Sequence, residues 1–137
     1  MNGHLALLGD SILDNGAYTD GGPDVVTHLR GILPAGWRAT LLAVDGSLVG
    51  DLEGQLADLP ADTTHVVVSA GGNNLLMNMD FLRLRVRSAP EALVKLGYRV
   101  AVFERAYRVA INRVLSLGKE IGGLHHLQRQ PGYGSRG

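Results

Sequence analysis

The sequence contains no cysteine among its 137 residues. This absence excludes disulfides, cysteine-ligated zinc and thiol nucleophiles, so covalent catalysis would need an oxygen nucleophile. Long apolar runs are also absent, because none approaches the roughly 18 residues that a membrane helix needs. The first residues lack the charged flank and apolar stretch of a signal peptide. With 45% hydrophobic and 19% charged residues, we expect one globular, cytoplasmic protein with no membrane partner.

The net charge is zero, but the charges are unevenly distributed along the sequence. Residues 1–80 carry two basic and ten acidic side chains, whereas residues 81–137 carry eleven basic and three acidic ones. A nucleic-acid face is one interpretation of the basic half. No aromatic interleaving and no nucleic-acid motif accompany the basic residues, so we favour a solvated helix face beside an acidic neighbour. We therefore expect no nucleic-acid partner.

Three short apolar runs, each followed by turn residues, have the pattern of buried strands. They are Leu5–Leu8, Ala39–Val44 and His65–Ala70. Near-continuous apolar runs of this length are typical of strands buried on both faces of a sheet. Helical patterns lie between them, from Pro23 or Asp24 to about Leu33 and from Leu48 to about Leu59. This alternation predicts an α/β fold in which right-handed crossovers build a parallel sheet and helices cover both faces.

The second half of the chain has fewer strand signals. A long helix is predicted from about Glu91 to Leu117, after an irregular stretch from Leu75 to Pro90. From Gly118 onward the sequence shows no strand-like apolar run. We therefore predict a domain over residues 1–118 and a loose C-terminal tail over residues 119–137.

Chemically useful residues follow each of the three predicted strands. Ser11 follows the first, Gly46 the second and Asn73 the third. In an open parallel sheet, ligands bind outside the carboxyl ends of the strands, so these residues are expected to meet at one edge. A serine there can attack a carbonyl, while the Gly46 N–H and the Asn73 amide can stabilise the resulting oxyanion. Asp10 and Asn74, beside them, are candidates for substrate binding, with helix capping as the alternative for Asp10.

These turns resemble the conserved blocks of a known enzyme family. Leu8-Gly9-Asp10-Ser11-Ile12-Leu13 resembles the first block of the SGNH/GDSL hydrolases, Val44-Asp45-Gly46-Ser47 the second and Gly71-Gly72-Asn73-Asn74 the third. The resemblance covers roughly residues 5–118. It implies a three-layer α/β/α sandwich with a flavodoxin-like parallel sheet, and an esterase or lipase activity that hydrolyses ester or acyl bonds. It also implies that Ser11 is the nucleophile and that the Ser11 N–H joins Gly46 and Asn73 in the oxyanion hole.

Two features depart from the family pattern. Asn74 stands where the family often carries Asp. The family's fourth catalytic element, an Asp-x-x-His after a further strand, has no match beyond Asn73 in this chain. The resemblance therefore predicts a sheet that lacks its last strands.

The general base is the open question of the sequence, because a serine without one is a poor nucleophile. Asp62-Thr63-Thr64-His65 has the required spacing but precedes the third strand, whereas Ser11 follows the first. A strand of about five residues would separate them by ~17 Å, too far for a hydrogen bond. His125 and His126, late in the chain, are the remaining candidates for the base, but we favour a position in the loose tail or on the surface for both. A truncated or degenerate, non-catalytic relative that keeps a small-ligand pocket is therefore the competing hypothesis.

Partners and cofactors follow from these interpretations. The sequence has neither Gly-x-Gly-x-x-Gly after the first strand nor Gly-x-x-x-x-Gly-Lys-Ser/Thr, so we expect no nucleotide and predict no cofactor and no metal. The expected ligand is a small-molecule ester. The stretch from Leu75 to Pro90 is expected to form a wall of its pocket. A sheet without its last strands exposes an edge, which predicts a homodimer through that edge or an aggregation-prone monomer.

Overall fold

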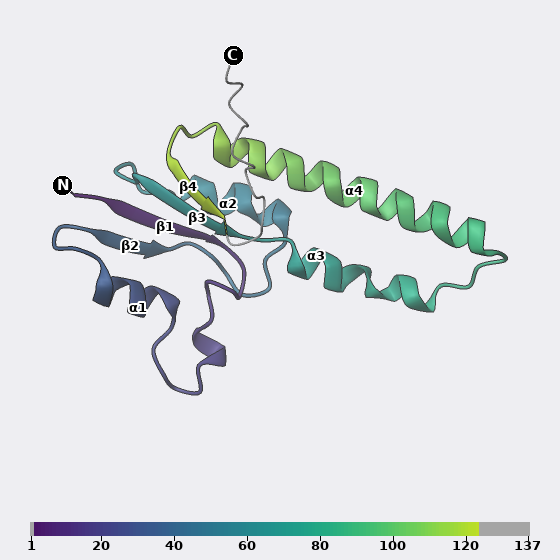
Figure 1. Cartoon of the computed structure of the whole chain (residues 1–137), viewed down its shortest axis with the longest axis horizontal. Coiled ribbons are helices and arrows are strands. Elements are labelled where there is room, and N and C mark those ends of the chain that lie inside the picture. Colours follow the sequence, from purple (N-terminus) through teal and green to yellow (C-terminus); the bar gives the residue numbers. More distant parts are fainter. Residues whose placement is uncertain (1, 124–137) are drawn as a thin grey trace, which may run out of the picture.

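The structure is a computed structural model that describes residues 2–123 and is organised around one parallel sheet (Figure 1). The strands are β1 (His4–Gly9), β2 (Arg38–Leu41), β3 (His65–Ser69) and β4 (Glu120–Gly123), in the order β2-β1-β3-β4. All three neighbouring pairs are parallel. The order corresponds to the first four positions of the flavodoxin-like order 2-1-3-4-5. The predicted α/β fold with a parallel sheet is therefore confirmed.

Helices cover both faces of the sheet, with α1 (Val25–Ile32) on one side and α2 (Leu52–Ala57) and α4 (Ala89–Leu115) on the other (Figure 1). The reason is visible in β1, where neighbouring side chains point to opposite faces. Leu7 packs with Val26 of α1, whereas Leu8 packs with Leu52 of α2 and Val114 of α4. All of these side chains are buried, so the sheet lies between two apolar layers.

Helix α1 begins where its sequence signals predict. The Asp24 side chain accepts a hydrogen bond from Thr27 N at 3.0 Å, the usual role of an aspartate at a helix N-cap. The second predicted helix, Leu48–Leu59, divides into the 3-10 helix η2 (Val49–Asp51) and α2. A further 3-10 helix, η1 (Gly16–Tyr18), lies before α1.

Strand β2 is shorter than the run Ala39–Val44 predicts, because the chain leaves the ladder after Leu41. Leu42 N and Ala43 N both donate to Leu7 O, at 2.9 and 2.8 Å. Val44 N then donates to Gly9 O at 3.1 Å. These bonds hold the turn that contains Gly46 against the end of β1.

The stretch expected to be irregular from Leu75 to Pro90 is largely helical, so this expectation was wrong. Helix α3 (Gly72–Met77) and the 3-10 helix η3 (Asn78–Arg83) run outward from the sheet, and α4 returns along them (Figure 1). We call residues 72–115, which comprise α3, η3 and α4, the arm. Helix α4 begins at the N-cap Ser88, whose Oγ accepts a hydrogen bond from Glu91 N at 3.2 Å.

Residues 120–123 were expected to belong to a loose tail, but they form β4 beside β3. That expectation was wrong for these four residues, and residues 124–137 lie outside the described part of the chain. Strand β3 is consequently internal, and β2 and β4 are the edge strands of the described sheet. Within residues 2–123, no helix combines the length and apolar character needed to span a membrane.

Candidate active site

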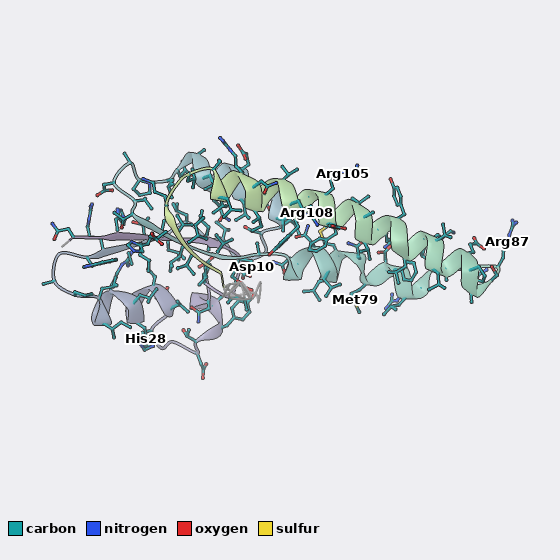
Figure 2. All side chains as sticks on the ribbon, turned by 45° about the horizontal axis from the view of Figure 1, so that its top comes forward. Asp10, His28, Met79, Arg87, Arg105 and Arg108 are labelled. Atoms are coloured by element: carbon teal, nitrogen blue, oxygen red, sulfur yellow. The ribbon has the colours of Figure 1, made fainter. Side chains whose placement is uncertain are left out.

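The turns that follow β1, β2 and β3 meet at the carboxyl edge of the sheet, because these strands are parallel neighbours. This edge carries Ser11, Gly46 and Asn73, the three residues that the sequence singled out. Figure 2 shows Asp10 at this end of the sheet, close to the start of the arm. The predicted meeting of the three turns at one edge therefore agrees with the topology.

The turn after β1 is held by Asp10, which is 4% exposed. Asp10 Oδ1 accepts a hydrogen bond from Ile12 N at 3.2 Å. Its main-chain oxygen accepts from Leu13 N at 3.1 Å and from Asp14 N at 2.9 Å. Ser11 lies inside this closed turn and is half-buried. Asp10 thus has a structural role here, and substrate binding by Asp10 stays a prediction.

Gly9 sets the direction in which the chain enters this turn. Its φ of 128° lies in a region that favours glycine. A Cβ at this position would overlap the main-chain oxygen of Ser69 in β3. Asp10 N, the next group along the chain, donates to that same oxygen at 3.0 Å. The close approach of β1 and β3 therefore requires glycine directly before the Asp10–Ser11 turn.

The turn after β2 places Gly46 on the surface at this edge, with a φ of 85°. Its neighbour Asp45 connects it to the loop after β1. Asp45 N donates to Asp14 Oδ2 at 2.7 Å, and the Tyr18 hydroxyl donates to the Asp45 carboxylate at 2.9 and 3.1 Å. The hydrogen bond to the Asp45 carboxylate, together with its negative charge, raises the pKa of Tyr18. These contacts fix the Gly46 turn relative to the Ser11 turn.

The first turn of α3, which follows β3, is tied to the same region by two asparagines. Asn73 Nδ2 donates to Ser47 O at 3.0 Å, which brings the Asn73 amide beside the residue that follows Gly46. An asparagine amide has two N–H donors, so this bond uses one of them. Asn74 Oδ1 accepts a hydrogen bond from Val49 N at 2.9 Å. Asn74 therefore holds η2 in place, and substrate binding by Asn74 stays a prediction.

Gln55 is a site residue that sequence reasoning missed. It is 7% exposed, and its side chain makes two hydrogen bonds to the backbone of Gly9. Gly9 N donates to Gln55 Oε1 at 2.7 Å, and Gln55 Nε2 donates to Gly9 O at 2.9 Å and to Ser47 Oγ at 3.2 Å. Strand β2 ends at Leu41, so it makes no ladder bonds to the end of β1. The Gln55 side chain supplies hydrogen bonds to the backbone of Gly9 there instead. The available signal was a polar residue three positions after Leu52, on the buried side of the helix.

The rejected Asp62-x-x-His65 pattern lies at the opposite edge of the sheet. Asp62 Oδ1 contacts His4 Nδ1 at 2.8 Å, and the Asp62 carboxylate also pairs with Arg38. His4 Nε2 contacts Thr40 Oγ1 at 2.6 Å. Burial, followed by the positive charge of Arg38, lowers the pKa of His4. These contacts give Asp62 and His4 structural partners at the amino edge of the sheet, which agrees with the rejection of this pattern as the general base.

No histidine in the described part of the chain follows a strand at the carboxyl edge. His4 and His65 begin β1 and β3, and His28 lies within α1. His125 and His126, the late candidates for the base, lie outside the described residues. Residues 2–123 also contain no group of three or more metal-ligating His, Asp or Glu side chains.

Comparisons with known proteins give similarity at the level of structure. No family model matches the sequence, and no curated protein matches it. An extracellular lipase from Streptomyces rimosus is 16% identical, with a TM-score of 0.53 over 90% of this chain and 58% of the lipase. A psychrotrophic esterase, EstA, from Pseudoalteromonas sp., solved with monoethylphosphonate as inhibitor, is 15% identical, with a TM-score of 0.50 over 89% of this chain and 77% of the esterase.

These similarities concern the fold, since both identities are low. The chain spans less than two thirds of the length of the Streptomyces lipase. The parallel α/β architecture derived above is thus one that a lipase and an esterase also have.

Proposed function

We propose that the chain is an SGNH-type ester or acyl hydrolase in which Ser11 is the nucleophile. The observation that carries this proposal is the way the three turns are tied together at one sheet edge. The Asn73 amide reaches the Gly46 turn through Ser47 O, and Val44 N binds that turn to Gly9 O, two residues before Ser11. The lipase and esterase folds found in the comparisons support the same class of reaction.

The proposed reaction has two steps. Ser11 Oγ attacks the ester carbonyl carbon while its proton passes to a base, and the base then gives that proton to the leaving oxygen, so that the alcohol leaves from the tetrahedral intermediate. Water then attacks the acyl-serine ester and releases the acid. The N–H groups of Ser11 and Gly46 and the second N–H of Asn73 Nδ2 would stabilise the negative oxygen in both steps. Donors fixed before the reaction are effective because they need little reorganisation as the charge develops.

The competing function is a non-catalytic protein that keeps a small-ligand pocket. One observation favours it: the described residues place no histidine after a strand at the carboxyl edge. A serine that keeps its proton is a weak nucleophile. The two functions differ in one measurable property, because only the enzyme shows turnover that depends on Ser11.

The test is hydrolysis of p-nitrophenyl acetate by the full chain and by Ser11→Ala. Ser116→Ala is a matched control, since the Ser116 hydroxyl is exposed at the end of α4 and binds only Arg113 O among the described residues. We expect Ser11→Ala to lose turnover and Ser116→Ala to keep it. Loss of a triad residue leaves ~10³–10⁴-fold catalysis over water, so the comparison between variants is decisive. Equal rates for the wild type and Ser11→Ala would overturn the proposal.

The base is tested separately by His125→Ala and His126→Ala in the same assay. If one of them supplies the base, that variant alone falls to the rate of Ser11→Ala, because nucleophile and base act as a unit. If both keep the wild-type rate, neither histidine is the base.

A further inference from the structure

A second feature of the molecule is an apolar groove that begins at the neighbours of Asn73 and runs along the arm. It lies between α3 and η3 on one side and α4 on the other, with a volume of about 460 Å³. The groove starts at Gly71, Gly72 and Asn74, which flank Asn73 at the start of α3. Figure 2 shows Asp10 at the end of the sheet where the arm begins, and Met79 further out along it. A volume of this size is within the ~300–1,000 Å³ of small-molecule sites.

The walls of the groove are large apolar side chains that no part of the described chain covers. Leu75 is 68% exposed, Leu82 74% and Val100 54%. Isolated exposed apolar residues are ordinary, but a contiguous set of them marks a binding surface. The inner end is formed by Phe103 and Tyr107, which pack against the core beside the sheet. The groove thus begins next to Asn73 and is apolar along its length.

The polar groups that border the groove are already paired. The Arg99 guanidinium binds both oxygens of the Asp80 carboxylate, at 2.7 and 3.1 Å. Its charge is therefore compensated, and it also lies 5.6 Å from the centre of the Phe81 ring. Asn78 Nδ2 donates to Asn74 O at 2.8 Å. A ligand in this groove consequently gains from burying apolar surface and finds no uncompensated charge among these side chains.

We propose that this groove binds the aliphatic chain of the ester, so that the protein prefers esters with long unbranched chains over acetates. This inference rests on the proposed function for the position of the ester group. The carbonyl would lie at Ser11 and Asn73, and the chain would extend from Gly71 between Leu75 and Val100 toward Leu96. The chain can belong to the acid or to the alcohol, since both place methylene groups beside the same walls.

The first experiment measures kcat/KM along two series of esters. One lengthens the acid in p-nitrophenyl esters from acetate to decanoate, and the other lengthens the alcohol in acetate esters. Each buried methylene should raise kcat/KM about fourfold until the groove is filled. The series that shows this rise identifies the side of the ester that enters the groove. If kcat/KM stays constant along both series while turnover still depends on Ser11, the proposed role of the groove is refuted and the proposed function is not.

A matched pair of variants tests the location. Val100→Phe narrows the groove, whereas Val94→Phe makes the same change at a 73% exposed position on α4 that does not line it. We expect Val100→Phe to lower kcat/KM for the decanoate about tenfold, with little change for the acetate. Val94→Phe should change neither value. Equal effects of the two variants would contradict the proposed location.

A direct measurement of alcohol binding tests the groove independently of the proposed hydrolase activity. Calorimetric titration of Ser11→Ala with 1-octanol and 1-butanol reports chain binding without turnover. The affinity should fall about fourfold for each methylene removed. Leu82→Gln should weaken 1-octanol binding, and Leu93→Gln, at an exposed position outside the groove, should not. Binding that depends on Leu82 in a protein without Ser11-dependent turnover would support the groove and refute the hydrolase. Absence of 1-octanol binding would refute the groove.

Discussion

Replacement of Gln55 by leucine should destabilise the fold through the turn that carries Ser11. Gln55 Oε1 is the acceptor that the structure gives for Gly9 N, and both groups are buried. Leucine has similar bulk but leaves that N–H without a partner. A buried donor without its acceptor costs about 1–3 kcal/mol, and the lost bonds to Gly9 O and Ser47 Oγ add about 1 kcal/mol. We expect Gln55→Leu to lower the free energy of unfolding by about 2–4 kcal/mol.

The assay is urea denaturation followed by circular dichroism. With an m-value of about 2 kcal/mol/M, the midpoint should fall by about 1–2 M. Gln55→Glu should also lower the midpoint, because its carboxylate still accepts from Gly9 N but can no longer donate to Gly9 O and places a charge in a buried position. Glu53→Gln is the control in α2, since Glu53 is exposed and its bond to Arg113 is on the surface. A change of less than about 0.5 kcal/mol for Gln55→Leu, as for a surface substitution, would refute the reasoning.

Three further substitutions test other contacts by the same unfolding measurement. Gly9→Ala should cost more than about 3 kcal/mol, because it adds strain at a φ of 128° to an overlap with Ser69 O, and a normal midpoint would contradict this. Burial, and then Arg38, lowers the pKa of His4 from 6.5. The contribution of His4 to the free energy of unfolding is therefore full above about pH 6.5 and is lost as the pH falls through the folded-state pKa. The free energy of unfolding of His4→Gln should fall less over that range. Ser88→Ala should cost about 1 kcal/mol through loss of the α4 N-cap, and no change would show that the cap is dispensable.

The part of the fold that could be predicted from the sequence is the part with strong local patterns. The runs around Leu7 and Val67 have few alternatives to buried strands, and Asp24 marks the start of α1 with a side chain that caps it. Because parallel strands end at one edge, the same patterns also predicted that Ser11 and Asn73 lie at the same edge of the sheet. Local sequence therefore determined the framework of the candidate site.

Strand β4 shows where local patterns were insufficient. Its four residues, Glu-Ile-Gly-Gly, have little intrinsic preference for a strand, and the pairing of Ile121 with Val66 in β3 is a tertiary contact. Helix α3 was missed for a related reason, because Gly71-Gly72-Asn73-Asn74 has the composition of a turn. In both segments the residues that form the deciding contacts are far apart in the sequence.

The hydrogen bonds of the site were also beyond sequence reasoning. Gln55 lies 46 positions from Gly9, and Asn73 lies 26 positions from Ser47. Residue types identified the turns, but the partners of each polar atom depend on how α2 and the turns pack together. The apolar groove has the same origin, since it forms only when α4 returns along α3 and η3.

The most direct test of the central claim is labelling of the full chain with a fluorophosphonate, followed by peptide mass spectrometry. An activated Ser11 attacks the phosphorus and keeps the covalent adduct. We expect the label on the peptide that contains Ser11, with the wild type and Ser116→Ala labelled equally and Ser11→Ala unlabelled. A chain that stays unlabelled, or one that is labelled equally in Ser11→Ala, would contradict the assignment of Ser11 as a catalytic nucleophile.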